Sequence, residues 1–374
     1  MESIKLGLPI SLSGRYSVQA TESFQGLSLF VSDINQEGGL YISELGQKVP
    51  LELIYYDDES TVDKCQELTE KLIVNDGVDI LIGPYSSSLT LCAAEVAESH
   101  GKTLWNHGGS TDEIGERGFN CVISTISPAS SYMRGILTLI RNTDNEARKV
   151  AVLSAYDSGF SRNIAIGAKA LAEKLGFETG DFKFKSGQED LKGLFEEVRE
   201  FEPDAILGMG RAEDDISIAK EIFRSGISAK AYGLVVASIK LFRDTFGDYS
   251  EGFISVSQWE KGLTIEPDIG PTPAEFSERF KSVYGKEPDY VAAQGYHIGL
   301  VIQHCLHESG TLDDEALRET AKSRGLKTFY GFFRTDSSGN QRGHETVVVQ
   351  WQGDRKVIVY PEEYKEAPLI YSLK

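Results

Sequence analysis

The sequence lacks any uninterrupted apolar run of about 18 residues, so no membrane-spanning helix is expected. Positive charge is scarce too, because 38 Lys and Arg residues stand against 57 Asp and Glu, which gives a net charge of −19. Nucleic acids and anionic membrane surfaces are polyanions, so neither is expected as a partner. With 374 residues, 40% of them apolar and 25% charged, the chain is typical of a globular protein with two domains.

Cysteine is rare, and the four cysteines show no C-x-x-C pairing: Cys65, Cys92, Cys121 and Cys305. This spacing excludes the usual zinc ribbons and thiol redox motifs, and we expect no metal and no cofactor. Cys65 and Cys92 fall near the starts of consecutive predicted helices on one face of a sheet. They are interpreted either as a disulfide or as two buried free thiols.

Catalytic motifs are missing as well, since the sequence contains no G-x-S-x-G elbow, no Walker loop and no H-E-x-x-H. Gly208 to Glu213 follows a predicted strand and opens a helix, as a dinucleotide fingerprint does. Glu213 stands where that fingerprint has its third glycine, and an acid there would repel a pyrophosphate. The sequence therefore predicts a protein that is not an enzyme.

The chain instead shows strand-like runs separated by helix-length intervals. This alternation predicts parallel βαβ units in two doubly wound sheets, an α/β class. The predicted strands are 4–9, 49–56, 78–82, 102–106, 149–154, 179–185, 205–208 and 229–233. The predicted helices are 22–35, 60–75, 86–97, 128–142, 160–175, 190–200, 212–225, 274–284, 290–309 and 313–324. From Gly331 onward the pattern is typical of antiparallel hairpins.

Two neighbouring turns form the centre of this arrangement. The strand 78–82 ends in Gly83-Pro84 and then in serines that open a helix, and the strand 102–106 ends in His107-Gly108-Gly109-Ser110-Thr111. Unpaired amides at a helix start can hold an anion, and parallel strands end on the edge where open α/β folds bind ligands. The two turns are expected to hold one carboxylate together, the alternative being an ordinary capped helix.

Several short segments resemble those of a known family in their order and spacing. They are Ser13-Gly14, 33–39, Tyr56-Asp57-Asp58, 75–78, 82–88, 156–160, Tyr330-Gly331-Phe332 and 336–339. Over essentially its whole length the chain resembles type I periplasmic binding proteins of the leucine-isoleucine-valine-binding kind, the solute receptors of ABC importers. The resemblance implies two doubly wound parallel-sheet lobes, 1–126 plus 259–338 and 127–258 plus 339–374. A hinge of three chain crossings would join them and close on a ligand.

The resemblance also implies which positions contact the ligand. Relatives that bind amino acids hold the α-carboxylate at the positions matched here by Ser87, Gly108 and Ser110. The other candidate ligand-binding residues are Gln19 in the first loop, Tyr85, Ser86, His107, Gly109, Asp157, Phe160 and Arg211. Tyr85 and His107 are interpreted either as cleft walls or as packing residues. For Arg211 the alternatives are a solvated arginine near two acids and a contact to an acceptor-rich ligand group.

One departure from the family bears on the ligand. Relatives that hold an α-ammonium group place a glutamate just after the strand matched by 231–233, where this chain continues Leu234-Val235-Val236. An ammonium group without a carboxylate partner is costly to desolvate. A carboxylate without an amine, or a polar neutral solute, is therefore favoured over an α-amino acid, unless Asp157 supplies the missing charge.

The sequence thus predicts a monomeric solute-binding component of an ABC importer. Its partners would be a small carboxylate or amino-acid-like ligand, captured between the lobes, and an ABC permease in the membrane. Its place would be the periplasm or the cell exterior, with no signal peptide in a sequence that opens Met1-Glu2-Ser3. The alternative is a cytoplasmic ligand sensor of the same fold, similar to amide-responsive regulators.

Overall fold

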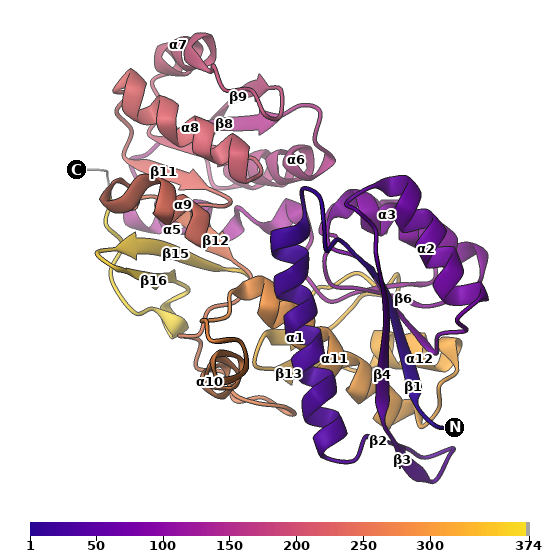
Figure 1. Ribbon diagram of the computed structural model, residues 1–374. Coiled ribbons are helices and arrows are strands. Elements are labelled where there is room, and N and C mark those ends of the chain that lie inside the picture. The colour runs from indigo at the N-terminus through magenta and orange to yellow at the C-terminus, as the bar shows by residue number, and fades with distance from the viewer. Residues whose placement is uncertain (372–374) are drawn as a thin grey trace. The chain divides into compact units, whose positions relative to one another are not determined.

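The computed structural model describes residues 1–371 of the 374, and the described chain folds into two compact units (Figure 1). Unit 1 comprises Met1–Ser127 and Leu263–Glu345, and unit 2 comprises Pro128–Gly262 and the chain from Thr346 onward. The last three residues of the predicted second lobe lie outside the described part. The predicted lobe boundaries stay predictions.

Unit 1 is built on a fully parallel sheet with the strand order β4-β1-β5-β6-β7. Its strands are β1 (Ile4–Ile10), β4 (Leu51–Asp57), β5 (Ile80–Ile82), β6 (Leu104–Asn106) and β7 (Val122–Ser124). The three short strands are entirely buried and apolar or nearly so, as expected of a sheet covered on both faces. Because all five strands run the same way, the segments after β5 and β6 meet at one edge.

Helices cover both faces of this sheet. They are α1 (Ser17–Gln36), α2 (Val62–Val74), α3 (Ser87–Ser99), α4 (Glu113–Glu116), α10 (Pro273–Tyr284), α11 (Tyr290–Ser309) and α12 (Asp314–Ser323). The long helices α1 and α11 lie side by side (Figure 1). They approach so closely that a Cβ on Gly26 would lie 1.9 Å from the carbonyl oxygen of Ala292. Two short antiparallel pairs complete the unit: β2 (Leu40–Ile42) with β3 (Gln47–Val49), and β13 (Leu326–Thr328) with β14 (Gly331–Phe333).

Unit 2 has a seven-stranded mixed sheet in the order β16-β15-β12-β11-β10-β8-β9. The parallel strands are β8 (Lys149–Ala155), β9 (Glu178–Phe184), β10 (Ala205–Met209), β11 (Ala231–Leu234) and β12 (Ile254–Ser257), and the antiparallel hairpin is β15 (Val347–Gln352) with β16 (Arg355–Tyr360). The helices are α5 (Arg134–Thr143), α6 (Gly159–Lys174), α7 (Lys192–Phe201), α8 (Ala212–Ser225) and α9 (Lys240–Phe246), with 3-10 turns at Ala129–Ser131, Gly247–Ser250 and Glu362–Tyr364. One apolar cluster packs α5 and α6 against the sheet, and a second packs α7, α8 and α9 against it.

Several local predictions differ from the structure. Helix α1 begins at Ser17 rather than near residue 22, so Gln19 lies in the first turn of a helix and not in a loop. The predicted helix 128–142 is a 3-10 turn followed by α5, which begins only at Arg134. Residues 331–333 pair within unit 1 and not with the final hairpin, which joins the sheet of unit 2.

All four cysteines are buried free thiols. Cys65 on α2 and Cys92 on α3 both approach the carbonyl oxygen of Leu89, at 3.5 and 3.1 Å from their sulfur atoms. Of the two interpretations of this pair, the structure confirms the buried free thiols. Among the described residues no helix is both long and apolar enough to span a bilayer.

Candidate functional site

The helix α3 begins with a strained residue. Ser86, its N-cap, has φ 100° and ψ 147°, a conformation that residues other than glycine rarely adopt. The backbone is held there from two sides, since the Ser86 amide donates to Gly108 O at 3.3 Å and Thr90 N donates to Ser86 O at 3.0 Å. Strain of this kind costs on the order of 1–3 kcal/mol and is often found at functional sites, where the surrounding structure maintains it.

The first turn of α3 presents hydrogen-bond donors that have no acceptor among the described residues. The Leu89 amide donates to Ser86 Oγ at 3.4 Å. The amides of Ser87 and Ser88 have no acceptor anywhere in residues 1–371. The Ser87 hydroxyl accepts from Thr111 N at 3.1 Å, which leaves its own proton to donate. Together with the positive end of the helix dipole, these groups are suited to an anion.

The turn after β6 is organised by Asn106, a buried residue that the sequence analysis did not single out. Its Oδ1 accepts from the amides of Gly109 at 2.8 Å and Gly108 at 3.2 Å. Its Nδ2 donates to Gly109 O at 2.7 Å and to Ser124 Oγ at 3.0 Å. The Gly108 and Gly109 amides are therefore already engaged by the protein. The expectation that Gly108 contacts the ligand stays a prediction, and in this structure its amide donates to Asn106.

The two turns nevertheless lie against each other. Tyr85 and Gly108 form a parallel β-bridge beyond the ends of β5 and β6. A Cβ on Gly108 would lie 2.6 Å from Pro84 O and 2.7 Å from the Tyr85 Cα, so only glycine permits this approach. Ser110, two residues further on, is buried, and its hydroxyl forms no hydrogen bond within the described chain. Unit 1 thus places Ser86, Ser87 and Ser110 at one edge of its sheet.

His107 is a buried packing residue of this edge rather than an exposed wall. Its Nε2 lies 2.5 Å from Ser23 Oγ on α1, and its carbonyl oxygen accepts from Gln294 Nε2 on α11. Burial lowers the pKa of His107 to about 4, so the imidazole is neutral at physiological pH. Gln19 lies one helical turn before Ser23 and on the same face of α1, which places it toward this edge.

In unit 2, the candidates Asp157 and Phe160 follow strand β8. Asp157 is exposed, and its Oδ1 accepts from the Ser186 amide at 2.8 Å, so the carboxylate ties the segment after β9 to that after β8. The Phe160 ring meets Tyr132 edge-on, with the ring centroids 5.7 Å apart, and packs on the apolar cluster of α5 and α6. Phe160 is half-buried, so part of the ring remains accessible.

Arg211 is the N-cap residue of α8, directly after β10. Its backbone amide donates to Asp214 Oδ2 at 3.0 Å, and the amide of Gly210 donates to Asp215 Oδ1 at 2.9 Å. The Arg211 guanidinium has no hydrogen bond, ion pair or ring partner within the described chain. The two nearby acids thus fix the backbone of Arg211 and leave its side chain unpaired.

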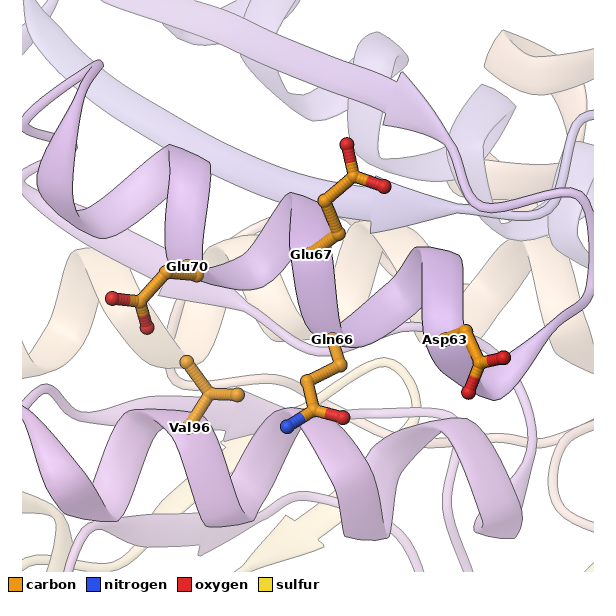
Figure 2. A pocket seen from close by; sticks show the side chains of 5 residues that line it. All are labelled: Asp63, Gln66, Glu67, Glu70 and Val96. Carbon is orange, nitrogen blue, oxygen red and sulfur yellow. The ribbon is translucent and has the colours of Figure 1, made fainter.

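A surface groove between α2 and α3 is a separate feature (Figure 2). Asp63, Gln66, Glu67 and Glu70 of α2 and Val96 of α3 line it. Gln66 and Val96 point into the space between the two helices, whereas Glu67 points away (Figure 2). Three of its five lining residues are acids, so it is unsuited to a carboxylate. No group of His, Cys, Asp and Glu in residues 1–371 is arranged to hold a metal ion.

Of the residues that the sequence analysis missed, Asn106 carried a usable signal. An asparagine directly before a small-residue turn commonly bonds to the backbone two or three residues later, and this Asn does so. Ser23 and Gln294 gave no such signal, because each lies within a long helix far from the turn in sequence. Only the packing of α1 against α11 brings them to His107.

The comparisons with known proteins agree with this architecture. A model of the periplasmic binding protein family matches residues 3–356. The Leu/Ile/Val-binding protein homolog 8 of Brucella abortus is 24% identical over 382 residues, which cover 97% of this chain and 91% of that protein.

Two solved structures share the fold. One is the substrate-binding protein LivJ of Streptococcus pneumoniae in complex with isoleucine, with TM-score 0.78, 18% identity and coverage of 96% of this chain and 100% of that one. The other is a solute-binding protein of an ABC transporter from R. palustris in complex with benzoate, with TM-score 0.78, 18% identity and coverage of 96% and 95%. These matches confirm the predicted α/β fold class. The chain belongs to the periplasmic binding protein family, whose members bind solutes and are not enzymes.

Proposed function

We propose that this protein is the solute-binding component of an ABC importer and that unit 1 holds the carboxylate of its ligand. The observation that carries the proposal is the cluster of unengaged donors where α3 begins. The amides of Ser87 and Ser88 and the hydroxyls of Ser87 and Ser110 converge at one sheet edge, and none of these protons has an acceptor in the described chain. An ionised carboxylate accepts up to four such bonds.

The strained Ser86 supports the same assignment. An ordinary helix cap gains nothing from a positive φ, whereas a binding turn can require one to aim its amides. Asn106 supports it further, because its four hydrogen bonds fix the 107–110 turn before any ligand arrives. A site that is ordered in advance loses less conformational entropy on binding.

The relatives support a carboxylate and leave its class open. One solved relative holds isoleucine and another holds benzoate, and both ligands carry a carboxylate. We propose that the ligand lies between the two units and that hinge motion closes them over it. The permease of the importer would be the membrane partner, and the protein would act outside the cytoplasmic membrane as a monomer.

A thermal-shift screen tests this proposal, since a ligand that binds only the folded state raises the melting temperature. The panel contains leucine, isoleucine, benzoate, 3,4-dihydroxybenzoate and 4-methylpentanoate, which is leucine without its amine. Affinities for every compound that shifts the melting temperature are then measured by calorimetry with Ser87→Ala and Ser110→Ala. Each substitution removes a hydroxyl donor to a charged group, so each is expected to weaken binding roughly tenfold or more.

Ser99→Ala is the matched control. Its hydroxyl donates to Val96 O at 2.7 Å at the far end of the same helix, so it should leave affinity unchanged. Urea unfolding of all three variants separates a loss of binding from a loss of folded protein. Unchanged binding in both Ser87→Ala and Ser110→Ala would refute the carboxylate site.

A further inference from the structure

The Arg211 side chain stands out in a strongly acidic chain. Thirteen of the described arginines have an acceptor or an aromatic ring as a partner for the guanidinium. Arg211 has none, although it is half-buried and the net charge is −19. A cation that is partly removed from water without a compensating acceptor is unfavourable, so an unpaired one calls for an explanation.

Two of the three acids that follow Arg211 in sequence, Asp214 and Asp215, are already committed, and the third, Glu213, is exposed and forms no ion pair with Arg211 within the described chain. Asp214 accepts from Ser186 Oγ at 3.0 Å and from Gly187 N at 2.7 Å, besides the amide of Arg211 itself. Asp215 accepts from the amides of Gly210 and Val236. Burial raises the pKa of Asp215 to about 8, so it carries little charge at neutral pH and is no counter-ion for the guanidinium.

A second unpaired group lies on the same sheet edge. Gln258 directly follows β12, which runs parallel to β11 and β10. Its side chain is 5% exposed, and neither atom of its amide has a hydrogen-bond partner among the described residues. Buried amides without partners are rare in folded proteins, and a missing ligand is one cause. At the carboxyl-end edge of this sheet, the guanidinium of Arg211 and the side-chain amide of Gln258 therefore both lack partners among the described residues.

We infer that Arg211 and Gln258 bind a second acceptor group of the ligand, distinct from the carboxylate held by unit 1. The ligand class is then a small acid with a further carboxylate, carbonyl or hydroxyl group away from the first carboxylate. The guanidinium would donate two parallel hydrogen bonds to a second carboxylate, or would donate to the single oxygen of a carbonyl or hydroxyl group, and the amide would donate one further bond. This inference rests on the proposed function, and it adds a specificity for bifunctional acids.

The test compares acids that differ only in the second group. The pairs are pentanoate with glutarate, and benzoate with both 4-hydroxybenzoate and terephthalate, each titrated calorimetrically into the wild type, Arg211→Gln and Arg211→Lys. The bifunctional member is expected to bind at least about tenfold more tightly than its partner to the wild type. Arg211→Gln should abolish that preference and leave the monofunctional affinity unchanged, while Arg211→Lys, which keeps the charge but not the fork, should restore part of it.

Gln258→Leu gives an independent readout. Replacing an unpaired buried amide by an apolar side chain should raise the stability of the ligand-free protein and weaken binding of the bifunctional acid. If acids bind but the wild type shows no preference within the pairs, or Arg211→Gln weakens both members equally, the inference is wrong and the carboxylate site of unit 1 stands. If a compound of the thermal-shift panel binds but no acid of either series does, the inference is wrong; if none of the compounds in the panel or in the two series binds, the proposed function fails, and this inference fails with it.

Discussion

Asn106→Ala is the substitution that tests most sharply whether the 107–110 turn is built for binding. The side chain makes four hydrogen bonds of 2.7 to 3.2 Å, three of them buried. At about 1 kcal/mol net for each bond, the substitution should lower the free energy of unfolding by about 4 kcal/mol. The amides of Gly108 and Gly109 would lose their acceptor, so the turn would also lose its fixed shape.

The matched control is Asn35→Ala. Asn35 makes two hydrogen bonds, of 2.8 and 2.9 Å, to the backbone of Leu51 at the opposite end of the sheet. By the same arithmetic it should cost about 2 kcal/mol and leave ligand affinity unchanged. Urea unfolding gives the stabilities, and calorimetry with the strongest ligand of the screen gives the affinities, both at a temperature where each variant is folded. Should Asn106→Ala cost no more stability than Asn35→Ala and bind equally well, Asn106 does not organise this turn.

Three further predictions follow from other groups. Ser86→Gly should raise the free energy of unfolding by roughly 1 kcal/mol, because glycine tolerates φ 100°. Ser86→Ala should lower it by about as much, because the helix loses its cap. Equal effects of the two substitutions in urea unfolding would contradict the presence of backbone strain at Ser86. Burial lowers the pKa of His107 to about 4 and of His297 to about 3, against about 6.5 in the unfolded chain, so the unfolded state binds more protons in that interval. The contribution of the two histidines is complete above pH 6.5 and should fall by up to about 2.7 kcal/mol per pH unit toward pH 4, whereas Asp215, whose pKa burial raises to about 8, binds its proton in the native state and offsets about 1.4 kcal/mol per unit of that fall. The free energy of unfolding should therefore decrease by up to about 1.4 kcal/mol per pH unit, and urea midpoints that stay constant or rise between pH 6.5 and pH 4.5 would contradict this. Asp157→Asn should weaken leucine and leave 4-methylpentanoate unaffected if Asp157 pairs an ammonium group, and calorimetry that shows equal losses would exclude that role.

Much of the fold could be predicted because its signals are local. The buried runs that became β5 and β6, and the helix Tyr290–Ser309, are visible in the spacing of apolar residues. The sequence pattern does not show the start of α1, because residues 17–22 are mostly polar and the helix as a whole is packed along α11 in the folded chain. Tertiary contacts determine where such helices begin, and these contacts cannot be inferred from a single sequence.

The candidate site was predictable to a lesser extent. The serines that begin α3 carry a local capping signal, and they lie where that signal indicates. The hydrogen bond from the Gly108 amide to Asn106 depends on the orientation of the asparagine side chain, which the sequence does not specify. The contact between His107 and Ser23 joins residues 84 positions apart, and only the folded chain reveals it.

The most direct measurement is calorimetric titration of the wild-type protein with matched acids and primary amides, beginning with benzoate and benzamide and continuing with glutarate and glutaramide. The members of each pair share size and shape and differ in the negative charge that the unpaired amides at the start of α3 are suited to hold. We predict that an acid binds and that its amide binds at least about tenfold more weakly. An amide that binds as tightly as its acid, or a complete lack of binding by the acids, would contradict it.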